Sequence, residues 1–260
     1  MSTPVDPVDL DVRTSPLWVT AFLDSTAEHF ATAVEFWSRT TGYTLSQPRG
    51  DDKEFATLVP PDGDAFLKVQ SLRAGEDRVH LDLHVPDPRA AADRAIALGA
   101  DELTFVGVGY VVLTSPGGQP FCFVSHLADR RPRPTGHPGG HASRVTQVAI
   151  DVPPAEYDRE LAFWEGVTGW QVEASTQFEE FRFLAPPQDR EQPLGILVQR
   201  LGDDDPGPVR AHLDWGTTDR TAEVERHVGL GATFVAKHDR WTVMQDPTGR
   251  IYCLTDEDPS

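Results

Sequence analysis

The chain has 260 residues, 39% of them hydrophobic, and a formal net charge of −18 at pH 7. This length and hydrophobic content suit two ordinary domains rather than a disordered chain. We expect neither nucleic acid nor an anionic membrane surface as a partner, because like charges disfavour their approach to so acidic a protein. The polar segment 1–15 lacks the apolar core of a signal peptide and no later run could span a bilayer, so we expect a flexible N-terminus and a cytoplasmic protein.

The first half of the chain predicts two successive units of the same kind, each a strand, a helix and three further strands. Alternating apolar residues mark the strands, and Gly42 and Gly99 mark the helix ends. The first unit has a strand over 18–24, a helical stretch ending at Gly42, and strands over 43–47, 54–59 and 65–72. The second unit has a strand over 78–85, a helix over 88–98, and strands near 102–106, 109–113 and 120–125.

The second half repeats this pattern, beginning with a strand over 145–152. Phe36-Trp37 recurs as Phe163-Trp164 after 127 residues, and His80-x-Asp82 recurs as His212-x-Asp214 after 132. Matches that keep their order within so narrow a range of offsets indicate a tandem duplication. We therefore predict an α+β fold made of four βαβββ units.

The duplication also gives the domain boundaries. We expect two domains over 16–127 and 144–257, joined by the Pro- and Gly-rich segment 128–143, whose arginines and histidines we interpret as solvated linker side chains. Cys122 and Cys253 occupy equivalent strand positions in the two domains. We expect both thiols to be reduced and buried, because a bridge would require these two strands to lie against each other.

Each strand is expected to turn its apolar residues towards a helix and its polar residues towards a concave surface. In the strand over 78–85 the period of two places His80, Asp82 and His84 on one face. Neighbouring side chains on one face lie roughly 7 Å apart, so we expect a histidine to hydrogen-bond an aspartate across strands rather than within one. The residues expected to line ligand-binding surfaces are Phe22, Asp24, Gln70, His80, Asp82, Gln147, Asp151, Gln199, His212 and Asp214. Further aromatic candidates by position are Phe66, Trp215 and Trp241.

The sequence resembles the vicinal oxygen chelate superfamily, and within it the glyoxalase-like and bleomycin-resistance-like domains. The resemblance covers nearly the whole chain and rests on ordered motifs present in both halves. These are Phe36-Trp37-x-x-x-Thr41-Gly42, Phe163-Trp164-x-x-x-Thr168-Gly169, the two His-x-Asp pairs, and the closing Asp246-Pro-Thr-Gly249-Arg-Ile-Tyr-Cys253. It implies two glyoxalase-like domains, with curved mixed sheets and helices on the outer face.

Metal-using members of that superfamily take ligands from the first, fourth, fifth and eighth strands of each pair of units. In this chain those positions hold Thr20, Lys68 or Gln70, His80 and Pro120, and then Gln147, Leu197 or Gln199, His212 and Ile251. A transition metal normally needs three imidazole or carboxylate ligands, and each half supplies one histidine and no carboxylate. We therefore expect no tightly bound metal and no other cofactor. The weak candidate pair Gln147 and His212 leaves room for a weakly bound divalent metal.

Two functional hypotheses and one structural alternative follow. In the first, each domain binds a small apolar or cationic molecule in its concave sheet without a tightly bound metal. In the second, the protein is a lyase or isomerase of the glyoxalase type, with His80 and His212 as candidate catalytic residues; an extradiol dioxygenase is disfavoured. The alternative is a scaffold whose histidines only support packing. The sequence allows either a monomer or a homodimer.

Overall fold

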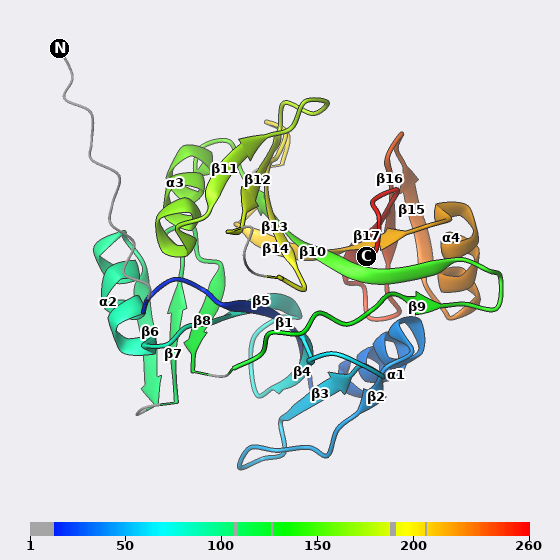
Figure 1. The fold of residues 1–260 in the computed structure, drawn as a ribbon, viewed down its shortest axis with the longest axis horizontal. Helices are drawn as coiled ribbons and strands as arrows, with labels where there is room; N and C mark the ends of the chain where they lie inside the picture. Colours follow the sequence, from blue (N-terminus) through cyan, green and yellow to red (C-terminus); the bar gives the residue numbers. More distant parts are fainter. Residues whose placement is uncertain (1–12, 107–108, 126, 188–190, 206) are drawn as a thin grey trace.

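The computed structural model describes residues 13–106, 109–125, 127–187, 191–205 and 207–260. Within these ranges the chain forms two mixed sheets with four helices around them (Figure 1). The first half contains β1 (Trp18–Thr26), α1 (Phe30–Thr41), β2 (Thr44–Leu45), β3 (Phe55–Val59), β4 (Leu67–Leu72), β5 (Arg78–His84), α2 (Pro88–Ala97), β6 (Asp101–Val106), β7 (Tyr110–Thr114) and β8 (Pro120–Val124).

The rest of the chain contains β9 (Thr135–Gly136), β10 (Ala142–Val152), α3 (Tyr157–Thr168), β11 (Gln171–Ala174), β12 (Phe181–Ala185), β13 (Gly195–Arg200), β14 (Arg210–Thr217), α4 (Arg220–Gly229), β15 (Thr233–Lys237), β16 (Trp241–Gln245) and β17 (Ile251–Thr255). The predicted α+β fold of repeated units is confirmed. None of the helices in the described ranges is both long and apolar enough to cross a membrane.

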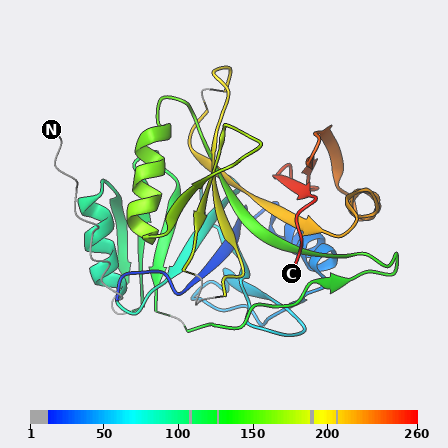
Figure 2. The same ribbon diagram turned by 45° about the horizontal axis from the view of Figure 1, so that its top comes forward.

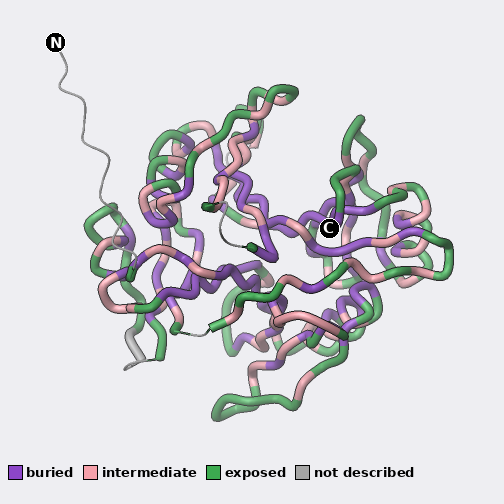
Figure 3. The backbone as a smooth tube through the Cα atoms, in the orientation of Figure 1, coloured by how far each residue is buried: buried purple, intermediate pink, exposed green. Residues whose placement is uncertain are grey.

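The two sheets have the same strand order. It is β2-β3-β4-β1-β5-β8-β7-β6 in the first half and β11-β12-β13-β10-β14-β17-β16-β15 in the second, with β9 paired to β10 outside this path. In each sheet the central strand, β1 or β10, runs parallel to one neighbour and antiparallel to the other. The central strands are the buried part of the fold, whereas the loops at the sheet ends are exposed (Figure 3).

Local sequence signals set the helix ends. Gly42 and Gly169 end α1 and α3 in the left-handed conformation, with φ of 73° and 66°, which glycine adopts without steric cost. Asp87 and Asp219 begin α2 and α4 by accepting hydrogen bonds from backbone N–H groups three residues on, each at 3.0 Å. Helices α1, α2 and α4 each contact strands of their own sheet.

The two halves interlock through their helices. Trp37 of α1 stacks on Trp215 of β14 with ring centroids 6.2 Å apart, and its indole N–H donates to Asp246 at 2.9 Å. In the corresponding contact of the other helix, Trp164 of α3 packs against Phe121 of β8, with ring centroids 5.3 Å apart. Figures 1 and 2 show α2 beside α3, and these helices come from different halves. The apolar sheet faces therefore cover each other as well as their own helices, and one hydrophobic core spans both halves.

The segment expected to be a solvated linker is partly buried. The side chains of His137 and His141 are only 7% and 5% exposed, and both face Glu223 of α4. His141 Nε2 lies 2.7 Å from a Glu223 carboxylate oxygen, and Ser143 donates to the other oxygen at 2.6 Å. This corrects the sequence interpretation: the β9–β10 hairpin docks on the second domain because its histidines meet a buried carboxylate.

Replacing Trp37 by alanine should destabilise the whole chain, because the indole is fully buried between the two halves. We expect a loss of about 3 to 5 kcal/mol in the free energy of unfolding, measured by chemical denaturation as a single transition. Leu103→Ala is the control, since Leu103 is 59% exposed and should cost little. Loss of structure in the first half alone would contradict a shared core.

Acid should weaken the docked hairpin through His137. Burial, together with the nearby Arg226 guanidinium, lowers the pKa of His137 from 6.5 to about 4. The unfolded chain therefore takes up the proton first as the pH falls from about 6.5 towards 4, and stability is lost over that window. Between pH 7 and pH 5, wild type should lose more unfolding free energy than His137→Gln. Equal losses in the two proteins would contradict a buried neutral histidine.

Candidate functional site

Each sheet has a pocket on its concave face. The first-half pocket has a volume of about 440 Å³ and the second-half pocket about 340 Å³. Nine of the ten expected residues line them. Phe22, Asp24, Gln70, His80 and Asp82 lie in the first, and Gln147, Gln199, His212 and Asp214 lie in the second. Asp151 lies outside the second-half lining and contacts His212.

A histidine on the fifth strand of each half is held by an aspartate from the neighbouring antiparallel strand. His80 Nδ1 lies 2.8 Å from Asp24 Oδ1, and His212 Nδ1 lies 2.9 Å from Asp151 Oδ2. The expected cross-strand pairing is confirmed. Because Nδ1 is engaged in this contact, the opposite nitrogen, Nε2, is left to face the rest of the pocket floor.

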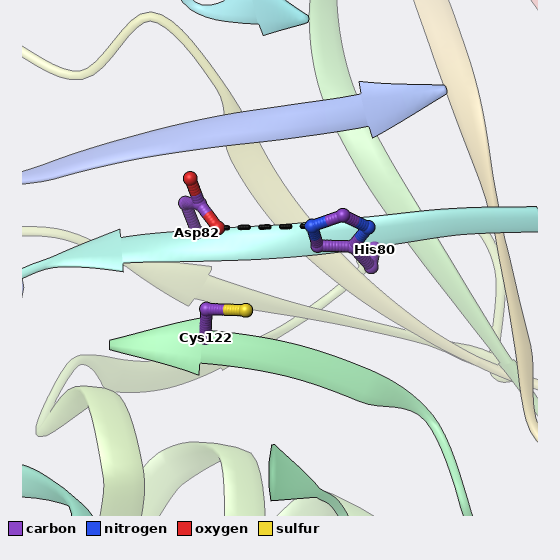
Figure 4. Close-up of side chains that lie close together, drawn as sticks. All are labelled: His80, Asp82 and Cys122. Carbon is purple, nitrogen blue, oxygen red and sulfur yellow. Dashed lines mark ion pairs between the residues drawn. The ribbon is translucent and has the colours of Figure 1, made fainter. Parts of the chain in front are cut away.

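A second aspartate lies close to the same imidazole within the strand. His212 Nε2 is 3.2 Å from Asp214 Oδ1, and His80 Nε2 is 3.7 Å from Asp82 Oδ1 (Figure 4). These contacts are ion pairs rather than hydrogen bonds, so the hydrogen bonds of both histidines to aspartates run across strands as expected, although the side-chain ends lie closer than ideal strand spacing suggests. Ideal spacing separates the backbone positions, but the two side chains lean along the strand and meet at their ends.

These charges shift one another's pKa values. Burial disfavours the charged imidazole of His80, yet the carboxylates of Asp24 and Asp82 outweigh it and raise the pKa of His80 well above 6.5. Burial likewise opposes ionisation of Asp82, but His80 and Lys68 hold the pKa of Asp82 at about 2. At His212, burial is again outweighed, by Asp151 and Asp214, and the pKa is raised. In each pocket floor, a positively charged imidazole ring therefore lies between two carboxylates.

The two cysteines also belong to the pocket floors. Cys122 pairs in register with Asp82 and Cys253 with Asp214, and both line the pockets. Cys253 Sγ lies 3.6 Å from His212 Nε2. Both cysteines are free and buried, as expected, and burial raises the pKa of each thiol. The sequence reasoning missed their place in the pockets, although the alternation along β8 and β17 carried the signal.

The pocket walls differ between the halves. In the second-half pocket Phe178, Phe181 and Trp241 form an aromatic cluster with ring centroids 5.1 to 5.6 Å apart. In the first-half pocket the Lys68 ammonium lies 4.9 Å from the centre of the Phe22 ring and 3.3 Å from Asp82 Oδ2. Neither Phe178, Phe181 nor Lys68 was among the expected ligand-binding residues.

Two aromatic candidates belong to the core instead. Phe66 is fully buried and Trp215 is 1% exposed, and neither lines the pocket of its half. Trp215 stacks on Trp37 from the other half, which explains its position on the apolar face. Trp241 alone of these three lies in a pocket wall.

The strand positions that the superfamily uses for metal do not fit a metal in either half. The Thr20 hydroxyl is engaged with His84 Nε2 at 2.8 Å, and the Gln147 amide donates to Asp214 at 2.8 Å. Pro120 and Ile251 have no donor atom in their side chains. The described residues do bring other donors together: a histidine, an aspartate and a cysteine in each pocket have ligand atoms within 4.8 Å of one another.

Paired βαβββ units with concave polar pockets define the vicinal oxygen chelate fold. The chain belongs to the glyoxalase-like domain family, whose model matches residues 20–124 and 147–255. None of the curated proteins compared with the sequence matches it.

Several solved structures share the fold. A Mn(II)-bound glyoxalase from Novosphingobium aromaticivorans is 16% identical, with 96% of this chain and 84% of that chain covered and a TM-score of 0.63. The 2,2',3-trihydroxybiphenyl 1,2-dioxygenase from Sphingomonas wittichii is 14% identical, with 94% of this chain and 90% of that chain covered and a TM-score of 0.62. A variant 4-hydroxymandelate synthase from Streptomyces coelicolor is 16% identical, with 95% of this chain and 94% of that chain covered and a TM-score of 0.60. Similarities at such low sequence identity establish the fold but not the chemistry.

Both thiols should be slow to react in the folded protein. The thiolate is the reactive form, and burial keeps Cys122 and Cys253 protonated and shielded. With a chromogenic disulfide reagent at pH 7.5 we expect little reaction in native protein and two thiols after denaturation. Rapid stoichiometric labelling of the native chain would show that a pocket floor is open and its thiol ionised.

Proposed function

We propose that this protein binds small organic molecules, one in the concave pocket of each half. The observation that carries the proposal is the second-half pocket, where aromatic walls enclose a buried acidic floor. Phe178, Phe181 and Trp241 supply the walls, and Asp214 lies beneath them. Its volume of about 340 Å³ falls within the range of ligand pockets, roughly 300 to 1,000 Å³.

The chemistry of this pocket favours an aromatic molecule that carries a positive charge. Ring faces attract cations, and the attraction grows when the cation is removed from water. Asp256, Glu257 and Arg240 line the same pocket, so that with Asp214 three carboxylates face one guanidinium. The net charge of −18 adds a field that concentrates cations around the protein.

The first-half pocket should select differently. Its lining includes Arg49, Lys68 and Arg78, and two of these cations are paired with Asp82 and Asp24 at 3.3 and 3.0 Å. A cationic ligand would have to displace one of them. We therefore propose an uncharged apolar ligand for this half, bound without a tightly held metal.

A second candidate function is a lyase or isomerase of the glyoxalase type. It is favoured by the histidine at each floor, because a carboxylate on Nδ1 orients the ring and the raised pKa keeps a proton available for general-acid catalysis. Mass spectrometry of a ligand recovered after incubation separates the candidates. Unchanged ligand supports binding, whereas turnover that is lost in both His80→Asn and His212→Asn supports an enzyme.

A cationic aromatic probe should stabilise the protein against heat. Benzyltrimethylammonium at 100 times its dissociation constant should add about 2.7 kcal/mol to the free energy of unfolding, by mass action. Trp241→Ala should abolish most of the shift in melting temperature, because the ring forms the pocket wall. Phe234→Ala is the matched control, since Phe234 lies on the adjacent β15 and is 49% exposed.

Two results would contradict this assignment. The first is an equal shift in Trp241→Ala and wild type. The second is a full set of ligand responses in a variant with alanine at both His80 and His212, since both pocket floors would then be irrelevant to binding.

A further inference from the structure

A third cavity, the interdomain cleft, lies between the two halves. It has a volume of about 720 Å³, and its walls come from the starts of β5 and β8 in one half and of β14 and β17 in the other. Figure 1 shows β5 and β14, which contact each other, at the centre of the molecule. We propose that this cleft binds a small organic molecule that carries a carboxylate group. It is a further site and does not rest on the ligands proposed for the two pockets.

Equivalent residues of the two repeats meet at the cleft. Arg78 begins β5 and Arg210 begins β14, and both line the cavity. Gly118 and Gly249 line it as a second equivalent pair. The duplication has therefore placed two guanidinium groups, one from each half, around the same cavity.

A third guanidinium group, that of Arg250, lies directly before β17. Arg250 is only 8% exposed and reaches the first half, where Nη2 donates to the backbone carbonyl of Asp24 and, at 3.1 Å, to Ser25 Oγ. Its Nε–H group is buried and has no hydrogen-bond partner among the described residues. A buried N–H group without an acceptor is costly, and a carboxylate oxygen of a ligand would satisfy it.

Arg78 contacts the same aspartate as Arg250 and keeps free donors. Its Nε donates to Asp24 Oδ2 at 3.0 Å, and its side chain is 49% exposed. No residue in the described ranges accepts a hydrogen bond from its two terminal nitrogens. Two nitrogens of one guanidinium form the fork that binds both oxygens of a carboxylate. Arg210 adds charge rather than free donors, because its terminal nitrogens bind Asp205 at 2.6 and 3.3 Å.

The acidic side chains of the cleft are engaged elsewhere or exposed. Asp77 accepts from a backbone N–H group and contacts His29 Nδ1, both at 2.8 Å, and Asp151 contacts His212 at 2.9 Å. Glu76 is exposed. A carboxylate with one charge suits the free guanidinium donors better than a phosphate with two, because the net charge of −18 opposes each added negative charge.

Apolar side chains line much of the remaining wall. They are Val79, Leu201, Val209, Val243 and Ile251. Such a surface can cover the hydrocarbon body of a ligand while polar groups fix its orientation.

The arginines distinguish the cleft from the two pockets. The second-half pocket shares Trp241 and His212 with it, so a ligand in the cleft would lie beside that pocket. Arg78 also lines the first-half pocket, whereas Arg210 and Arg250 line neither pocket. Substitution of these two arginines therefore reports on the cleft alone.

The test is a titration of the full chain with benzoate, measured by calorimetry and by NMR shifts of backbone amides. We expect one saturable site per chain, with the largest shifts at Gly118 and Gly249. Arg250→Lys should weaken benzoate binding about 10-fold or more, because it keeps the charge but removes the Nε–H donor. Arg210→Gln should weaken binding about 3-fold, since it removes one partly exposed charge.

Two exposed arginines outside the cleft provide the comparison. Arg39→Gln is the matched control, because Arg39 lies on α1 and pairs with Glu35. Arg49→Gln removes an arginine that lines only the first-half pocket. Both variants should bind benzoate as tightly as wild type.

Arg78→Gln guards against misfolding of the variant at the buried Arg250. It should also weaken benzoate binding about 10-fold, and an unchanged circular dichroism spectrum would show that it folds. The proposal is overturned if benzoate shows no saturable binding, if benzyl alcohol binds as tightly, or if inorganic phosphate binds more tightly. It is also overturned if Arg49→Gln weakens binding and Arg210→Gln does not, because benzoate then occupies the first-half pocket.

Discussion

The contact between a strand histidine and an aspartate on the neighbouring antiparallel strand determines the rest of each pocket. Because His80 and His212 are buried, their charge requires a partner, and Asp24 and Asp151 supply it through Nδ1. This fixes the ring plane and directs Nε2 towards the aspartate two residues further along the strand. The cysteine of the adjacent parallel strand completes the floor.

The arrangement depends on a core shared by both halves. Each sheet uses its apolar face to pack against helices and against the other sheet, and this leaves the opposite face free to form a pocket. Trp37 and Trp164 are fully buried, and each packs against an aromatic ring from the other half. A rigid floor follows, since movement of a pocket strand would disturb packing in the other half.

Much of the fold could be predicted because alternation and duplication depend on local geometry and on order along the chain. The faces of β1 and β5 followed from a period of two, and nine of the ten expected residues line the pockets. Whether those residues bind a ligand remains a prediction. The contact between Lys68 and Asp82 depends on how the strands are ordered in the sheet, which the alternation does not specify.

Two other features lay beyond sequence reasoning for a similar reason. The segment containing His137 and His141 has a linker composition, and only the tertiary structure places it against Glu223. Trp215 lies on the apolar face that the alternation predicts, but it packs against an aromatic ring from the other half, and no pattern within one half predicts this contact. The repeated pattern within each half therefore does not predict the contacts between the two halves.

Duplication gave both floors a histidine, an aspartate and a cysteine, but the residues around them differ. Lys68 adds a cation to the first floor, 3.3 Å from Asp82, whereas Leu197 occupies the matching position in the second half. The most direct test of the histidine–aspartate contact is an NMR titration of the imidazole protons in wild type, in Asp24→Asn and in Asp151→Asn. The predicted result is that the pKa of His80 and of His212 lies well above 6.5 in wild type and falls in the variant that lacks the facing carboxylate. An unchanged pKa in both variants would contradict the account.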